Sequence, residues 1–437
     1  MDTKKLRQKI LDLAIHGKLV PQDPNDEPAS VLLERIKAEK EQLIKEGKIK
    51  RQKKSASSDT SHYGNMPKGW ANTTIGEIFT LQAGKNISSQ EIHPNRSPNF
   101  QYPCYGGNGI RGYVSTANRN GDYPIIGRQG ALCGNVNIAS DFFYATEHAV
   151  VVQLYCNMNL KWAFYVLTAL NLNQYATATA QPGLAVNVIN DVPLLLPPIQ
   201  EQERISREID NYFSLLESFE KNIICLNSNV HQAKSLVLDL ALSGKLTTSH
   251  TSHYPQLPDG WKEVRLGDIC RLISGTSYSK NDVKPDGIRI LRGGNIQYGK
   301  VLLLDNDVYI STSLRNKECS LMKGDIIIVA STGSFDLIGK AGYIEQDIPN
   351  AQIGAFLRIV RPIDSSISQY LRLIFESILY RSHIQDLAKG TNINNIKASY
   401  ITDFCIPLPP MGERKKICNI VKIIFQQLDD IESSMLK

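Results

Sequence analysis

The chain has 437 residues, of which 42% are hydrophobic and 21% are charged, and its formal net charge is +6. This length exceeds one ordinary core and predicts two or three domains, while the mild basic excess permits a polyanionic partner without requiring one. The sequence lacks a run of eighteen apolar residues and an apolar signal core after Met1, so we expect a cytoplasmic protein without a membrane span.

The first expected element is a helix within residues 1–22, with Leu6, Ile10 and Leu13 on one side. Its segment Leu-Asp-Leu-Ala, followed by Gly-Lys-Leu, spans residues 11–19 and occurs again 227 positions later. This is the first sign of an internal repeat.

Residues 23–65 follow as an additional segment. Ser30 is expected to cap a helix that runs to about Glu46. A basic run at 48–54 and a Ser-rich run to residue 61 then predict a flexible, solvated tether, although the basic run could also contact DNA phosphates.

Residues 66–196 are expected to form a globular module of short strands and helices. Apolar runs such as 123–127 predict strands, and a helix is expected near 159–174. We expect Trp70, in the opening Pro-x-Gly-Trp turn, to anchor the first strand of the module in its core.

Residues 197–249 are expected to form a long central helix, because apolar side chains alternate at spacings of four and three. Pro197 and Pro198 stop the preceding strand, and Gly244 fits the left-handed residue beyond the end of the helix. The predicted coiled-coil seam comprises Ile205, Ile209, Tyr212, Leu216, Phe219, Ile223, Leu226, Val230, Val237 and Leu240.

Residues 257–408 repeat the plan of the first module. Segment 257–275 aligns with 66–84 without gaps at an offset of 191, and Trp261 takes the place of Trp70. Segment 401–410 aligns with 189–198 at an offset of 212, so the second module is expected to contain about 21 additional residues.

Residues 409–437 repeat the first part of the central helix at an offset of 212, as residues 1–22 repeat its last part. The two ends of the chain therefore read as halves of a second, split helix that pairs antiparallel with the central one. The predicted fold is α+β, with two similar α/β modules joined by two long antiparallel coiled-coil helices in a circular, pseudo-twofold arrangement. The seam of the last segment comprises Ile417, Val421, Ile424, Leu428 and Ile431.

The modules share their frames but differ in loops rich in Asn, Gln, Arg, Lys and Tyr, as expected of two related domains that bind different ligands. Arg and Lys can pair with guanine edges, and Asn and Gln with adenine. Any single one of these residues could be an ordinary exposed loop position, and the set carries the inference. The candidates in the first module are Lys85, Asn108, Arg111, Arg128 and Gln129. The candidates in the second module are Lys280, Arg289, Arg292, Asn295, Gln297, Lys340, Asn392 and Lys397.

Motifs for catalysis are absent from the sequence. It has no G-x-x-x-x-G-K-[S/T] phosphate loop, no H-E-x-x-H, no G-x-S-x-G and no Asp/Asn-Pro-Pro-aromatic motif of DNA amino-methyltransferases. Its eight cysteines stand singly, without a C-x-x-C pair. We therefore expect no intrinsic catalysis, no metal site and no cofactor in this chain.

The Pro-x-Gly-Trp turns at 67–70 and 258–261, the Leu-Pro-Pro segments followed by Glu201-Gln202, and the two heptad helices resemble the specificity subunit of type I restriction-modification enzymes. The second copy departs from the pattern, with Glu413-Arg414 in place of Glu-Gln. The resemblance implies that each module is a target-recognition domain for one half of an interrupted, asymmetric DNA site.

The same resemblance implies that the helices set the spacing and bind two methyltransferase subunits that use S-adenosylmethionine, while motor-nuclease subunits use ATP and Mg. Two alternatives stay open. One is a specificity module of a different DNA methyltransferase, and the other is a coiled-coil adaptor that binds proteins.

Overall fold

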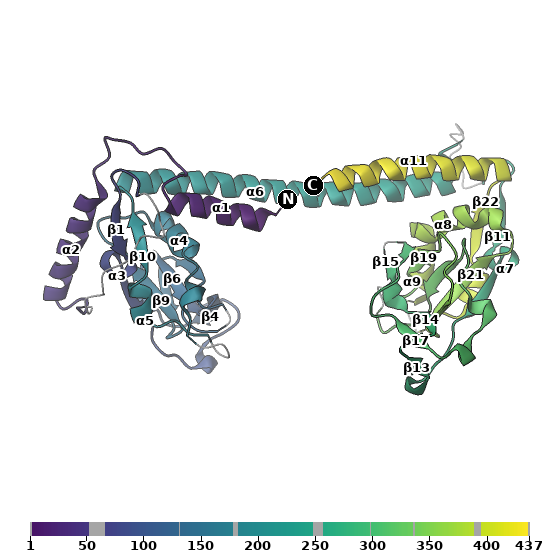
Figure 1. The fold of residues 1–437 in the computed structure, drawn as a ribbon, viewed down its shortest axis with the longest axis horizontal. Helices are drawn as coiled ribbons and strands as arrows, with labels where there is room; N and C mark the ends of the chain where they lie inside the picture. Colours follow the sequence, from purple (N-terminus) through teal and green to yellow (C-terminus); the bar gives the residue numbers. More distant parts are fainter. Residues whose placement is uncertain are drawn as a thin grey trace. The chain divides into compact units, whose positions relative to one another are not determined.

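The computed structural model describes residues 2–51, 66–130, 132–177, 182–247, 257–297, 299–334, 337–388 and 395–435. The chain divides into two compact units, Met1–Lys221 and Asn222–Lys437, and each is described by itself. Helix α6 (Ile199–Leu242) is continuous over 44 residues and contributes to both units (Figure 1). The predicted long central helix and the mixture of helix and sheet are confirmed.

The first unit contains two four-stranded sheets and a separate two-stranded ribbon. The ribbon pairs β1 (Ala71–Thr74) with β10 (Pro193–Leu196). One sheet has the order β2 (Thr80–Ala83), β9 (Ala149–Gln153), β6 (Tyr123–Gly127) and β7 (Val136–Ala139). The other has the order β4 (Gly109–Val114), β3 (Tyr102–Gly106), β8 (Phe142–Ala145) and β5 (Arg119–Asn120). Its helices are α1 (Thr3–Ile15), α2 (Ala29–Lys45), α3 (Ile75–Ile78), α4 (Leu160–Ala169) and α5 (Val186–Asn190).

The second unit repeats this plan with a larger sheet. Its ribbon pairs β11 (Lys262–Arg265) with β22 (Cys405–Leu408). The six-stranded sheet has the order β12 (Cys270–Ser274), β21 (Leu357–Pro362), β18 (Ile326–Val329), β19 (Ala341–Tyr343), β16 (Lys300–Val301) and β15 (Ile296–Gln297). The four-stranded sheet has the order β13 (Val283–Lys284), β17 (Val308–Ile310), β14 (Ile288–Leu291) and β20 (Ala351–Ile353). Its helices are α7 (Leu266–Ile269), α8 (Ser368–Glu376), α9 (Ile378–Ala388), α10 (Ala398–Thr402) and α11 (Met411–Met435).

Strand register shows where the additional residues of the second module are inserted. Strand β2 pairs Leu81 with Val152, and β12 pairs Leu272 with Val360, so the offset between the modules has grown from 191 to 208 by this strand. The ribbons reach the full offset of 212 at their last strands. The additional residues are therefore spread over several loops, which preserves the pairing of the strands that both modules share.

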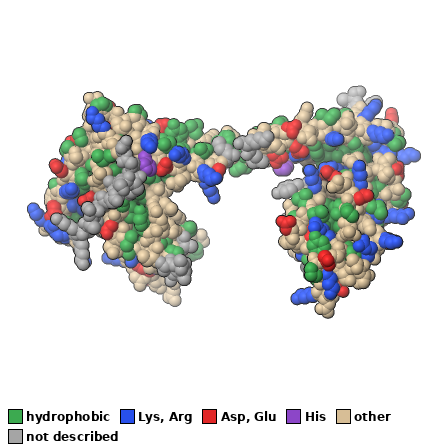
Figure 2. Space-filling view, viewed as in Figure 1, with side chains coloured by type: hydrophobic (Ala, Val, Ile, Leu, Met, Phe, Trp, Pro, Cys, Tyr) green, Lys and Arg blue, Asp and Glu red, His purple; other side chains and the backbone are tan. Residues whose placement is uncertain are grey.

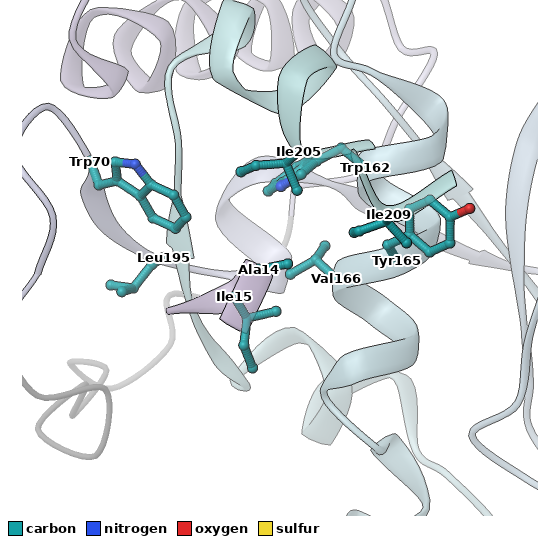
Figure 3. A pocket seen from close by; sticks show the side chains of 9 residues that line it. All are labelled: Ala14, Ile15, Trp70, Trp162, Tyr165, Val166, Leu195, Ile205 and Ile209. Carbon is teal, nitrogen blue, oxygen red and sulfur yellow. The ribbon is translucent and has the colours of Figure 1, made fainter. Parts of the chain in front are cut away.

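Helix α1 runs antiparallel to the first part of α6 within the first unit. Arg7, near its start, forms an ion pair with Glu220 at 3.3 Å. Ala14 and Ile15, at its end, instead line one small space together with Ile205 and Ile209, 11 and more residues earlier in α6 (Figure 3). The space left among these side chains is only about 10 Å³, so the apolar junction is a packed core rather than a ligand site.

Helix α11 is likewise antiparallel to the last part of α6 within the second unit. Lys234 of α6 contacts Asp429 at 2.5 Å, while Thr247, beyond the end of α6, donates a hydrogen bond to Glu413 at 2.7 Å. Later residues in and after α6 thus contact earlier residues of α11, so the two helices run in opposite directions. The first unit and the second unit therefore contain one half each of the same helix-pairing plan (Figure 1).

Burial along the predicted seam is uneven. Ile205, Ile209, Val230, Ile417 and Val421 are buried. Intermediate exposure is found at Leu216, Ile223, Val237, Leu240, Ile10, Leu13, Ile424 and Leu428. More than a third of the side-chain surface is exposed at Tyr212, Phe219, Leu226, Leu6 and Ile431. Four of these five buried side chains belong to the module cores, whereas Val230 is buried in α6 outside them.

One sequence-based detail differs from the structure. Helix α2 begins at Ala29 with Pro28 at its N-cap, so Ser30 lies inside the first turn and makes no capping hydrogen bond. The ring of Pro28 fixes a φ that is compatible with this position, although it satisfies none of the free N–H groups of the first turn. The predicted tether falls largely on residues 52–65, outside the described residues. Among the described residues, no helix is long and apolar enough to cross a membrane.

Candidate nucleic-acid interface

Each module is fastened to its helices by the same contacts, which fix the loops that follow. Trp70, 5% exposed, donates its indole N–H to the Glu201 carboxylate at 2.9 Å. Trp261, 7% exposed, donates to Glu413 at 3.0 Å. The prediction that both tryptophans anchor the modules is confirmed, and each carboxylate is the hydrogen-bond partner that a buried indole requires.

A glycine completes each of these joints. Gly17 has a φ of +63°, and a Cβ there would lie 2.4 Å from Cγ of Pro67. Gly244 has a φ of +75°, and a Cβ there would lie 2.4 Å from Cγ of Pro258. Both glycines end a helix in the left-handed region at a place where the next turn of chain leaves no room for a side chain. We refer to the Gly17–Trp70–Glu201 contacts as the first joint and to their counterparts as the second joint.

Two candidates of the first module, Lys85 and Arg128, contact one turn through their backbone N–H groups. The Lys85 N–H donates to the Ala145 carbonyl at 3.0 Å, and the Arg128 N–H donates to the His148 carbonyl at 2.8 Å. The Arg128 guanidinium also donates to the Leu184 carbonyl at 3.2 Å. Three elements that are distant in the sequence therefore meet at the turn between β8 and β9, residues 146–148.

The remaining candidates of this module lie beside that turn or on the next sheet. Gln129 forms an isolated bridge with Gly183, and a Cβ at Gly107 would lie 2.6 Å from the Gln129 carbonyl oxygen. Asn108, next to Gly107, accepts a hydrogen bond from Asn135 at 2.7 Å. The side chains of Lys85, Asn108, Arg111 and Gln129 are exposed, as a base-contacting role requires.

In the second module, Lys280 and Arg292 lie on the rim of one cavity of about 520 Å³. Its lining comes from segments 276–280, 291–293 and 354–357, together with Val283. Both cations are exposed. In the view of Figure 2, Lys and Arg side chains lie at the tip of this unit together with Asp and Glu side chains. A concave site with two cations is suited to an anionic ligand.

Two other candidates of the second module have their polar groups engaged inside it. Asn295 is only 1% exposed, and its amide donates to the Leu302 carbonyl and to the Asp307 carboxylate. Arg289 forms an ion pair with the same Asp307 at 3.5 Å and lies over the Tyr309 ring. These side chains hold the loop at 292–307 together, which differs from the expectation that they face a ligand.

The other candidates are scattered. Gln297 donates to the Gly294 carbonyl at 3.0 Å, and Lys340 is partly exposed. Lys397 is exposed, and its ammonium lies 5.9 Å from the centre of the Tyr400 ring. Asn392 lies outside the described residues.

The sequence reasoning missed the side chains at the centre of each site. In the first module these are Glu147 and His148, which contact each other at 3.1 Å and which have buried polar atoms, Oε2 and Nδ1, without a hydrogen-bond partner among the described residues. In the second module it is Phe356, whose surface is 68% exposed. A search for Asn, Gln, Arg and Lys overlooks all three residue types.

Two buried thiols, Cys104 and Cys270, are not activated nucleophiles. Burial raises the pKa of Cys104 in β3 to about 11, although the nearby Arg111 charge lowers it. Burial likewise raises the pKa of Cys270 in β12 to about 12. Both thiols are therefore protonated near neutral pH, and their environments are those of structural rather than reactive cysteines.

The chain contains two modules with one frame, and their equivalent loops carry different side chains. One continuous helix contributes to both units. This arrangement defines a two-part recognition protein. The family described as "Type I restriction modification DNA specificity domain" matches residues 67–226 and 258–436. The chain belongs to this family and is a specificity subunit of the type I restriction-modification class.

Relatives resemble different lengths of the chain. The type I restriction enzyme EcoprrI specificity subunit of Escherichia coli is 49% identical over 33% of this chain and 36% of its own length. The EcoAI specificity subunit of Escherichia coli is 23% identical over 98% of this chain and 90% of its own length. A chain from a solved structure concerning complex assembly and conformational transition of the type I R-M system has a TM-score of 0.59 at 18% identity. It covers 85% of this chain and 94% of its own, which supports the fold.

Proposed function

We propose that each module binds one half of an interrupted, asymmetric site in double-stranded DNA, and that this chain supplies specificity rather than catalysis. The observation that carries the proposal is the pair of equivalent loop sites, which keep the same backbone contacts but present different side chains. A shared frame with different tips is suited to reading two different sequences. A cytoplasmic location would follow from access to the chromosome.

We further propose that α6, with α1 and α11, sets the spacing between the half-sites. A helix of 44 residues has a length of about 66 Å, and its stiffness converts two weak contacts into one spaced recognition event. The same helices would bind two methyltransferase subunits that use S-adenosylmethionine, and motor-nuclease subunits would add ATP- and Mg-dependent translocation and cleavage. Leu215 and Ile224 of α6, 66% and 70% exposed, support a protein partner there.

The first test is a genome-wide map of N6-methyladenine in the host with and without the gene. We expect one interrupted motif to lose methylation on deletion and to reappear on complementation. Replacement of residues 66–196 by the equivalent module of another family member should change one half of the motif only. An unchanged map in a host with active methyltransferase subunits would contradict the proposal.

The adaptor alternative makes a different prediction for binding in solution. A DNA-binding complex with six to ten phosphate contacts should lose roughly 10³-fold to 10⁵-fold in affinity between about 50 and 200 mM salt. An adaptor whose modules bind only protein should bind DNA weakly and without a motif. Leu215→Glu should in turn weaken copurification of the methyltransferase subunits and leave the fold intact, because this side chain is exposed.

A further inference from the structure

The turn between β20 and β21 presents Phe356 from a fixed backbone. The Phe356 carbonyl accepts hydrogen bonds from the Ala330 and Ser331 N–H groups at 2.9 and 3.0 Å. Its neighbour Leu357 is completely buried, yet the Phe356 side chain is 68% exposed. An aromatic ring held outward by a rigid turn gains little for the stability of the fold, and its exposure points to a ligand.

Strand register identifies the counterpart of Phe356 in the first module. Because Val152 is equivalent to Val360, the offset of 208 makes His148 equivalent to Phe356. The Arg128 N–H donates to the His148 carbonyl, as the Ala330 N–H does to Phe356. The two side chains thus occupy the same place on the same frame, and they differ completely in chemistry.

The cavity beside Phe356 indicates the class of its ligand. This cavity has a volume of about 520 Å³, and its lining contains Lys280 and Arg292 and no carboxylate. Tyr278 and Leu291 contribute further apolar surface. A ligand that satisfies both the cations and the ring must join negative charge to an apolar edge, as phosphate and thymine do on one face of duplex DNA.

We propose that Phe356 is a specificity-determining residue of the second module, in contact with the 5-methyl group of a thymine in its half-site. The proposal rests on the DNA-specificity function proposed above. Lys280 and Arg292 would contact the flanking phosphates and set the register, while Phe356 would discriminate between bases, because phenylalanine contacts the thymine methyl group in the major groove.

The test compares Phe356→Ala with Ile363→Ala in the complete complex with the methyltransferase subunits. Ile363 is 60% exposed and follows β21, whereas Phe356 precedes it, so the two variants remove similar surface at opposite ends of one strand. The probe is a duplex that contains the mapped motif, with each thymine of the second half-site replaced in turn by uracil. Melting curves of both variants should match the wild type.

We expect uracil at one position to weaken wild-type binding, and Phe356→Ala to weaken binding to the thymine duplex roughly tenfold to a hundredfold. The variant should lose nothing more with uracil at that position, and Ile363→Ala should behave as the wild type. Equal affinity of Phe356→Ala and wild type, or additive effects of the variant and uracil, would overturn the proposal. A wild-type complex without any DNA motif would instead refute the proposed function beneath it.

Discussion

Replacement of Gly17 by alanine tests whether the first joint holds α1 on its module. The left-handed φ of +63° costs an alanine roughly 1–2 kcal/mol, and its Cβ would lie 2.4 Å from the rigid Pro67 ring. Overpacking of this kind adds roughly 1–3 kcal/mol. The total of roughly 2–5 kcal/mol should appear as local opening of α1, because the clash is relieved when α1 separates from the turn that contains Pro67.

Native-state hydrogen exchange measures this opening directly. Since about 1.4 kcal/mol corresponds to a factor of ten, amides of α1 should exchange at least roughly 30-fold faster in Gly17→Ala. Gly47→Ala is the matched control, because Gly47 also has a positive φ, +71°, but has no atom within 4 Å of the added Cβ. Equal exchange of α1 in the two variants would show that the close contact does not secure the joint. Gly244→Ala should leave α1 unchanged and accelerate exchange at the end of α6.

Three further predictions concern buried groups. Burial raises the pKa of Glu201 above its ordinary 4.5, so the native state binds the proton more tightly than the unfolded state does. The wild type should therefore lose stability relative to Glu201→Gln as the pH rises from about 4 to about 7. A constant difference between the urea midpoints of the two proteins over this pH range would refute this. Iodoacetamide at about pH 8 should alkylate exposed Cys225 quickly and buried Cys104, whose pKa is raised to about 11, only on unfolding, as peptide mass spectrometry can check. Asp325→Ala should cost roughly 3–5 kcal/mol in denaturant unfolding, because the Arg361 guanidinium loses the buried carboxylate to which it donates two 2.8 Å hydrogen bonds and keeps only the Glu318 and Ser320 carbonyls; a loss below about 1 kcal/mol would contradict the role of this pair.

The architecture could be predicted because it depends on patterns that survive in the sequence. A heptad repeat identifies a long helix without knowledge of its partner, and the repeated Trp70 and Trp261 turns mark the start of each module. The exposed Tyr212 and Phe219 show the limit of this approach. Periodicity says which face of a helix is apolar, but not over what length another element covers it.

The centres of the loop sites could not be predicted, because their equivalence is hidden by insertions. His148 and Phe356 differ by 208 positions, an offset that no shared motif reveals and that only the strand register supplies. Residue type also misled the prediction at Asn295. Its amide resembles a base-reading group, but it bonds to a loop carbonyl and to Asp307, which a linear sequence does not show.

The two joints have a consequence for how such a chain can change over generations. A module exchanged by recombination that kept a tryptophan at this position would meet the same helix carboxylate and the same glycine that Trp70 and Trp261 meet here. The incoming segment needs only the right ends, whatever its interior contains. The residues that attach a module to the helices and the residues that contact its ligand are thus encoded by separate stretches of the gene. One module could therefore be replaced by another without a change in the helices.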